Sequence, residues 1–211
     1  MTKTQTKNGF FYPNKMGRIV LLSLEEIVGP NAVRAILGQA GLTYYVGKYP
    51  ANNLKKQFKF NDLSQILVAL EQLFGPRGGR GVALRSGRVC FKYGLREFGP
   101  MLGFSDLAFR LSPLETKLQA GVEIFADIFN QFSDQRVRVE VGDEQILWHI
   151  DRCPVCWNRH ADSPVCHLAV GILQESLYWV SGGKVFTVEE VSCTARGDPT
   201  CSILIEKQPL G

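Results

Sequence analysis

Hydrophobic residues recur at helical spacing along most of the first 133 residues of the chain. The dipeptide Gly29-Pro30 interrupts the first apolar stripe, and Asn61 or Asp62 can cap the helix that begins after them. We expect helices over the stretches in which apolar residues return every three or four positions, which are 16–28, 31–39, 63–74 and 113–132.

The segments between these helices have weaker patterns. Residues 1–15 are mainly polar and predict a flexible N-terminal tail, and residues 44–59 are aromatic and basic without a clear period, which predicts irregular structure. The glycine-rich stretch 75–81 lacks the ending and the preceding strand of a phosphate-binding loop. It is more typical of a flexible connector or of a closely packed helix N-terminus.

The pattern changes to strict alternation after residue 134. Residues 136–141 alternate basic and apolar side chains, Gly142-Asp143 predicts a turn, and 146–150 continues as the partner strand. A helix from Pro164 to Gly182-Gly183 follows, and then strands over 185–193 and 201–206.

This order of elements predicts the fold class. We expect an α+β protein in which N-terminal helices pack on a mostly antiparallel four-stranded sheet, with the order strand-strand-helix-strand-strand at the C-terminus. We also expect one domain over residues 16–211, with a helical part (16–133) and a metal-containing α/β part (134–211).

Composition and charge narrow the class of protein. The chain has 211 residues, of which 45% are hydrophobic and 21% are charged, which suffices for one well-buried core. The net charge of +4 is mildly basic but lacks the clustered basic face of a nucleic-acid-binding protein. No apolar run approaches the about 20 residues of a membrane span, and no signal peptide is recognisable, so we expect a cytoplasmic protein.

Five of the six cysteines lie between Cys153 and Cys201. Thiols this close together, in a chain with no export signal, indicate metal ligands before disulfides. Zinc binds four ligands, usually thiolates, imidazoles or a carboxylate. The candidate ligands are Cys153, Cys156, Cys166, Cys193, Cys201, His160, His167, Glu189 and Glu190.

Zinc ranks first among the roles that these cysteines could have. An iron–sulfur cluster ranks second and disulfides rank third, and each cysteine taken alone resembles a small buried hydrophobic residue. The remaining Cys90 lies in apolar helical sequence and is expected in the core. The segment that begins at Cys153 reads C-P-V-C-W and lacks the C-x-x-C-H pattern of covalent haem attachment.

The C-terminal residues carry a family resemblance. Cys153, Cys156 and Cys166, then G-I-L at 171–173 and V-E-E-V-S-C-T-A-R-G-D-P-T-C-S-I-L-I at 188–205, resemble the vinyl-4-reductase domain family. The resemblance is specific over about the last 60 residues and looser upstream, where the stretch 78–88 fits an Arg/Gly-rich helical segment. The family is similar to aromatic-sensing domains of bacterial regulators, and its fold to haem–nitric-oxide sensors and TRAPP vesicle-tethering subunits.

The resemblance implies an α+β unit with an internal apolar ligand cavity, often dimeric, so we expect a bacterial homodimer. In the aromatic sensors a zinc ion is held by a cysteine before the helix and by a Glu-x-x-Cys…Cys set. These positions correspond to Cys166, Glu190, Cys193 and Cys201.

Strand geometry leaves the ligand set open. Glu190 and Cys193 project to opposite faces of a regular strand, so joint ligation requires a bulge or an early strand end, and Glu189 has the better parity. Cys153 and Cys156 could also replace the glutamate and give an all-thiolate site.

The sequence favours binding over catalysis. The family name implies reduction of a vinyl group in a chlorophyll precursor, which requires a hydride source. No nicotinamide- or flavin-binding motif and no paired carboxylates stand out, and we name no catalytic residue. A metal with four protein ligands also has no position for a substrate.

The leading hypothesis is a zinc-stabilised sensory or carrier module that binds a small apolar or aromatic ligand or a tetrapyrrole. The alternatives are an enzyme or accessory subunit that reduces the vinyl group of a chlorophyll-type precursor, and a dimerising scaffold. Arg77, Arg80, Arg85 and Arg88 could pair with ligand carboxylates, although a solvated helix face is the preferred interpretation. The expected cavity lining is aromatic: Phe91, Tyr93, Phe98, Phe104, Phe109, Phe125, Trp148, Tyr178 and Trp179.

Overall fold

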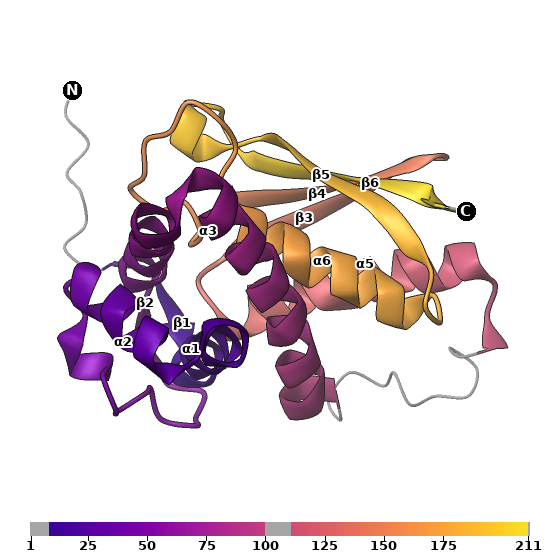
Figure 1. Cartoon of the computed structure of the whole chain (residues 1–211). Helices are drawn as coiled ribbons and strands as arrows, with labels where there is room; N and C mark the ends of the chain where they lie inside the picture. Colours follow the sequence, from indigo (N-terminus) through magenta and orange to yellow (C-terminus); the bar gives the residue numbers. More distant parts are fainter. Residues whose placement is uncertain (1–8, 100–110, 211) are drawn as a thin grey trace.

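The structure is a computed structural model that describes residues 9–99 and 111–210. The helices are α1 (Asn14–Val28), α2 (Pro30–Gln39), α3 (Phe60–Phe98), α5 (Leu114–Phe132) and α6 (His167–Val180). The strands are β1 (Phe11–Pro13), β2 (Lys56–Lys59), β3 (Arg136–Val141), β4 (Gln145–Arg152), β5 (Val185–Ser192) and β6 (Cys201–Leu210). Figure 1 shows the N-terminal helices at one end and the C-terminal sheet over α5 and α6.

The C-terminal sheet has the strand order β3-β4-β6-β5, and all its neighbours are antiparallel. Its first two strands form the predicted hairpin, which is closed by a hydrogen bond of 2.9 Å from Gly142 N to Gln145 O. Along β4, the buried Ile146, Trp148 and Ile150 share the face that packs on the helices. The predicted α+β class, with a mostly antiparallel four-stranded sheet, is confirmed.

The helix α3 bends at the glycine-rich stretch. Gly75 has a φ of +73°, a left-handed conformation that glycine adopts without steric cost, and Pro76 then starts the second half of the helix. The stretch is therefore a kink with a helix start, which agrees with the prediction of a closely packed helix N-terminus.

The second half of α3 crosses α6 at very short range. A Cβ atom on Gly87 would lie 2.2 Å from the carbonyl oxygen of Leu168, and one on Gly171 would lie 2.1 Å from the carbonyl oxygen of Leu84. Only glycine at both positions allows this approach, so the two helices form the centre of the molecule (Figure 1).

The N-terminal segment differs from the prediction of a tail over residues 1–15. Phe11–Pro13 forms β1, which pairs with β2 in the stretch predicted to be irregular, and α1 already begins at Asn14. The pairing was missed because three or four residues are too few to show an alternating pattern.

Three boundaries also differ from the sequence predictions. Lys59 precedes α3, and neither Asn61 nor Asp62 caps it. Instead, Asp62 accepts hydrogen bonds from the hydroxyl groups of Tyr44 and Tyr45. Helix α6 begins three residues after Pro164, and β6 extends four residues beyond the predicted end.

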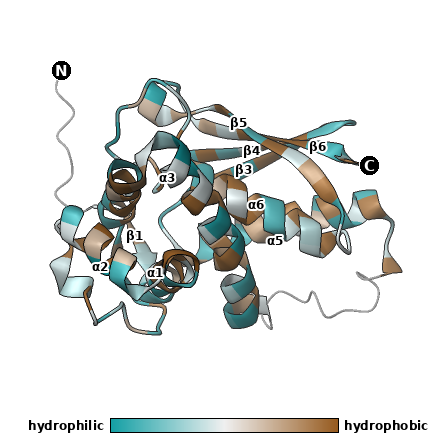
Figure 2. Cartoon of the chain, viewed as in Figure 1, coloured by the Kyte–Doolittle hydropathy of each residue, from teal (hydrophilic) through white to brown (hydrophobic). Residues whose placement is uncertain are grey.

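Hydropathy follows this architecture. In Figure 2, α1 and the first part of α3 are largely in the hydrophobic colour, whereas the strand ends beside the C-terminus are hydrophilic. Among the described residues, no helix combines the length and the apolar character that crossing a membrane requires.

Candidate metal centre and apolar cavity

Five buried cysteines converge at one end of the sheet. Cys153 and Cys156 lie in the loop after β4, and Cys166 directly precedes α6. Cys193 follows β5, and Cys201 is the first residue of β6. Figure 1 shows the loop after β4 and the turn before β6 at the same end of the sheet, and the backbone N–H of residue 161 bonds the carbonyl oxygen of residue 195 between them at 3.0 Å.

The sulfur atoms lie at distances that suit metal ligands. The Sγ–Sγ distances are 3.5 Å for Cys153–Cys166, 3.3 Å for Cys156–Cys201, 3.8 Å for Cys166–Cys201 and 3.9 Å for Cys166–Cys193. A tetrahedral ion with metal–sulfur bonds of about 2.3 Å holds its sulfurs about 3.8 Å apart. The geometry therefore fits thiolates around an ion, and the cysteines are not disulfide-bonded.

The donor atoms form two groups, and within each group all ligand atoms lie within 4.8 Å of one another. One group contains only thiols, and the other contains the carboxylate of Glu190. The all-thiol group is Cys153, Cys156, Cys166 and Cys201, and the mixed group is Cys166, Glu190, Cys193 and Cys201.

Glu190 reaches this centre through a strand irregularity. The register of β5 on β6 shifts between Glu190 and Ser192, so Glu190 and Cys193 can project to the same side. Glu190 Oε2 accepts a hydrogen bond of 2.7 Å from Cys166 N, whereas Oε1 is buried without a partner in the described part of the chain. Burial, and then the charge of Cys193, raise the pKa of Glu190 to about 8.

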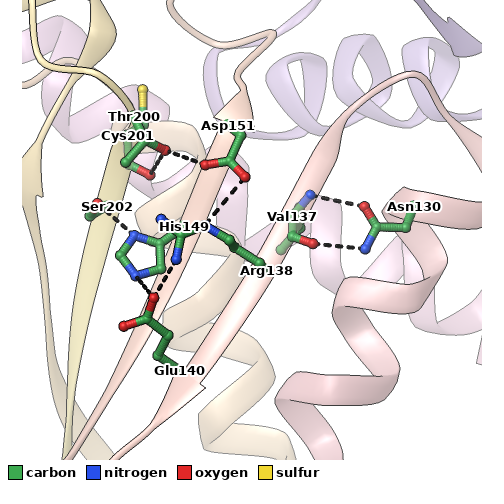
Figure 3. A network of polar contacts seen from close by, with 9 residues as sticks. All are labelled: Asn130, Val137, Arg138, Glu140, His149, Asp151, Thr200, Cys201 and Ser202. Atoms are coloured by element: carbon green, nitrogen blue, oxygen red, sulfur yellow. Dashed lines mark hydrogen bonds and ion pairs between the residues drawn. The ribbon is translucent and has the colours of Figure 1, made fainter.

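Two other candidate ligand types lie away from the centre. Glu189, which had the better parity in a regular strand, is exposed, so that interpretation was wrong. Neither His160 nor His167 belongs to the two donor groups, which were searched over the described residues. His149 lies on the outer face of the sheet, where Nδ1 is 2.8 Å from Ser202 Oγ and Nε2 is 3.4 Å from Glu140 (Figure 3).

The protonation of the thiols is divided. Hydrogen bonds from neighbouring thiols, that of Cys153 first, lower the pKa of Cys156. Burial raises the pKa of Cys153, and hydrogen bonding to Cys153 and Cys156 raises the pKa of Cys201. The protein alone therefore favours one thiolate among several thiols, and full ionisation requires a cation, because metal ligation displaces thiol protons.

Backbone donors surround the cluster. Thr194 N lies 3.3 Å from Cys201 Sγ, and Cys193 N donates to Asp198 Oδ2 at 2.8 Å. The second bond fixes the turn that brings Cys193 and Cys201 together. Such outer contacts orient the ligands of metal sites.

A second feature is an apolar cavity of about 100 Å³ between α1, α3, α5, α6 and the inner face of the sheet. Of the residues predicted to line it, four do so: Phe91, Phe98, Phe125 and Trp148. The other lining residues include Met16, Ile19, Val20, Leu63, Gly94, Leu95, Ile128, Phe129, Ile150, Val155, Leu168, Ala169, Ile172 and Leu173.

Three predicted lining residues lie elsewhere. Tyr178 and Trp179 are 47% and 39% exposed, because they occupy the solvent side of α6, and Tyr93 donates a hydrogen bond to Glu26. Phe104 and Phe109 lie outside the described residues. Arg85 and Arg88 bond the carbonyl oxygen of residue 81 and the side chain of residue 174, and none of the four arginines lines the cavity.

The cavity has one polar end that sequence reasoning missed. The Tyr12 hydroxyl donates to Gln135 Oε1, and both side chains are buried in the cavity wall. The amide nitrogen of Gln135 makes no hydrogen bond within the described part of the chain. Tyr12 had been assigned to the tail, although the apolar run Phe10–Tyr12 was the signal that could have placed it in the core.

Cys90 also lines the cavity. Burial raises the pKa of this thiol to about 12, so it stays protonated at neutral pH. Burial likewise raises the pKa of Tyr12. Neither group can exchange a proton easily near neutral pH, and no other ionisable side chain belongs to the described lining.

Comparison with known structures supports the fold. An H-NOX protein from K. algicida, in its Fe(II) unliganded form, superimposes with a TM-score of 0.60 at 13% identity over 92% of this chain and 95% of that chain. An H-NOX protein from S. oneidensis in the Fe(II)NO ligation state gives a TM-score of 0.57 at 12% identity over 92% and 99%. At these identities the likeness establishes the fold alone.

Comparison by sequence locates the family. No curated protein matches the chain. The family model of the vinyl-4-reductase domain matches residues 148–207, which include five cysteines and Glu190. The predicted resemblance to this family and to the haem–nitric-oxide sensor fold is confirmed: residues 148–207 carry a vinyl-4-reductase domain sequence within a chain that has the H-NOX fold.

Proposed function

We propose that this protein is a sensory or carrier module that binds a small, mainly apolar molecule of about one aromatic ring in its internal cavity. The cavity itself is the observation that carries this proposal, because it is enclosed by buried side chains from five elements and has only one polar end within the described residues. Ligand sites in proteins are typically concave and apolar, with a few placed polar groups.

The size of the cavity selects the ligand. An apolar cavity of about 150 Å³ takes up benzene, whereas sites for drug-sized ligands measure about 300–1,000 Å³. The volume of about 100 Å³ therefore favours one ring over a tetrapyrrole.

The polar end selects the chemistry. The free amide N–H groups of Gln135 favour a hydrogen-bond acceptor, and the hydroxyl oxygen of Tyr12 can accept one bond in return. A phenol or an aryl carbonyl satisfies the amide, and a phenol satisfies both groups, whereas a hydrocarbon leaves the amide unpaired at a cost of about 1–3 kcal/mol.

The metal centre has a structural role in this proposal. We infer that zinc is bound by the all-thiol or by the mixed group, because both sets are closed by protein ligands. Sulfurs this close leave no room for the inorganic sulfides of an iron–sulfur cluster. The centre fixes the loop that contributes Val155 and the helix that contributes Leu168 and Ala169 to the cavity wall.

A tetrapyrrole ligand is the second candidate, because one similar structure is described as concerned with haem redox potential and porphyrin distortion. The described lining does not favour it. It has no imidazole, and its one thiol stays protonated, whereas haem iron is usually held by histidine, thiolate, methionine or tyrosinate. The lack of lining groups that exchange protons also favours binding over vinyl reduction.

Calorimetric titration with phenol, toluene and haemin tests the proposal. Phenol should bind one site with a Kd of about 10–100 µM, which corresponds to somewhat under 1 kcal/mol per non-hydrogen atom, and more tightly than toluene. Tyr12→Phe should reduce this preference. Haemin binding without phenol binding would instead support the tetrapyrrole ligand.

A matched pair of variants connects binding to the cavity. Gly94 lines the cavity and has open space around a Cβ, so Gly94→Leu should fill the space and abolish phenol binding. Gly81 lies in the same helix, also has open space and does not line the cavity, so Gly81→Leu should bind normally. Equal binding by both variants would place the ligand elsewhere.

A further inference from the structure

The two donor groups of the metal centre overlap. Both contain the sulfurs of Cys166 and Cys201, which lie 3.8 Å apart. The remaining donors separate into two pairs, Cys153 with Cys156 and Glu190 with Cys193. Each pair lies within ligand distance of the shared sulfurs, but the six donors do not form one group. This arrangement corresponds to two tetrahedra with a common edge.

We propose that the centre holds two divalent, thiophilic ions of the zinc class, bridged by the thiolates of Cys166 and Cys201. The first ion has Cys153 and Cys156 as its terminal ligands, and the second has Cys193 and the Oε1 atom of Glu190. The shared edge of 3.8 Å equals the sulfur separation of about 3.8 Å that each tetrahedral ion requires. The inference extends the metal centre of the proposed function and rests on it.

Glu190 supplies an independent observation. Its side chain is 8% exposed, Oε2 is used by Cys166 N, and Oε1 is buried without a hydrogen-bond partner in the described residues. A buried carboxylate oxygen without a partner is costly. The second ion is the group that satisfies it, whereas a single ion in the all-thiol group leaves it orphaned.

Charge leads to the same conclusion. With all ligands deprotonated, the centre contains five thiolates and one carboxylate, all buried. One divalent ion neutralises two of these six negative charges, and two ions neutralise four. A single ion in either group leaves two buried donors from the other group without a cation. Buried anions are stable only when they are paired or bound to a metal.

Native mass spectrometry of the full chain, saturated with zinc and then desalted, measures the number of ions directly. Two zinc ions per chain are expected, and elemental analysis should give the same ratio. Cadmium NMR on the cadmium-loaded protein should show two resonances that are coupled through the shared sulfurs.

Paired variants assign the two positions. Cys153→Ser with Cys156→Ser should retain one ion, and Glu190→Gln with Cys193→Ser should retain the other. Cys166→Ser should lower the occupancy of both, and Cys90→Ser should retain two ions. Wild-type spectra do not depend on how well the variants fold, so they decide the proposal even if a variant is unstable.

The outcomes separate this inference from the proposed function. One ion per wild-type chain at saturating zinc would overturn the two-ion centre and leave phenol binding unaffected. No bound ion would overturn both the inference and the zinc role in the proposed function. Phenol binding depends on the cavity and is measured separately.

Discussion

At the scale of single residues, Cys166 connects the features of the site. Its sulfur belongs to both donor groups, its backbone N–H binds Glu190, and it directly precedes α6. The helix N-terminus favours negative charge at this position. One side chain thus couples the ligands to the helix that lines the cavity.

Replacing Cys166 should remove this coupling. Cys166→Ser should lower metal content and destabilise the fold by several kcal/mol, because the binding energy of a structural metal is also folding energy. Thermal unfolding with and without a chelator measures the effect: the chelator should lower the Tm of wild type but hardly that of the variant. Cys90→Ser is the control, and an unchanged metal content in Cys166→Ser would contradict the ligand assignment.

The sequence was informative about residue types but not about side-chain direction. The five clustered cysteines could be predicted from spacing, and the Glu-x-x-Cys resemblance pointed to Glu190. Parity favoured Glu189, because a register shift near Ser192 cannot be seen in the spacing of residues. Tyr12 and Gln135 meet across more than a hundred residues, so no local pattern could have predicted their contact.

At the scale of elements, the crossing of α3 and α6 determines the shape of the cavity. The two helices approach so closely at Gly87 and Gly171 that backbone contacts backbone. The adjacent parts of the same helices contribute Phe91 and Ile172 to the lining. The cavity is therefore sensitive to the separation of this helix pair.

Gly87→Ala should force the helices apart. The new Cβ would lie 2.2 Å from a backbone oxygen that cannot rotate away, so a loss of about 3 kcal/mol or more is expected, at the upper end of overpacking effects. Urea unfolding measures the loss. Gly94→Ala, in the same helix with open space around the Cβ, should instead stabilise by about 0.5–1 kcal/mol. Similar stability of both variants would contradict the close crossing.

Strand β1 is held on the domain by Asp134. Phe11 N donates to its carboxylate at 2.9 Å, Asp134 N donates back to Phe11 O at 3.0 Å, and Lys56 Nζ lies 3.0 Å from Oδ1. Burial raises the pKa of Asp134, but the Lys56 and Phe11 hydrogen bonds outweigh it and hold the pKa below the usual 3.8.

Asp134→Asn should therefore have a pH-dependent effect. A carboxyl group with a lowered pKa stabilises the fold above the pKa of the unfolded chain, and this stabilisation is lost as the pH falls through the folded pKa. The variant should be about 1 kcal/mol less stable at pH 7, because an amide retains one hydrogen bond but loses the charge. Urea unfolding should show this difference decline below about pH 4; a constant difference would contradict the role of the charge.

The elements themselves could be predicted where the pattern was long enough. The helices α1, α2, α5 and α6 and the hairpin of β3 and β4 followed from periodicity, with boundary errors of a few residues. The small sheet of β1 and β2 could not be predicted, because its strands pair across more than forty residues and are too short to alternate.

At the scale of the whole molecule, the metal centre and the cavity share their walls. The cysteine-bearing loop and the N-terminal end of α6 contribute Val155 and Leu168 to the lining, and β1 contributes Tyr12 at the polar end. In our proposal, ligand binding is thus supported from the metal side and from the N-terminal side. The predicted homodimer would provide the surface through which a sensory module signals.

The most direct test is a crystal structure with 4-bromophenol, located by the anomalous signal of bromine. We predict one bound molecule inside the cavity, with its oxygen within hydrogen-bond distance of Tyr12 or Gln135 and its bromine among the aromatic side chains around Trp148 and Phe125. Bromine found only outside the cavity, at ligand concentrations well above the Kd measured by calorimetry, would contradict the proposed function.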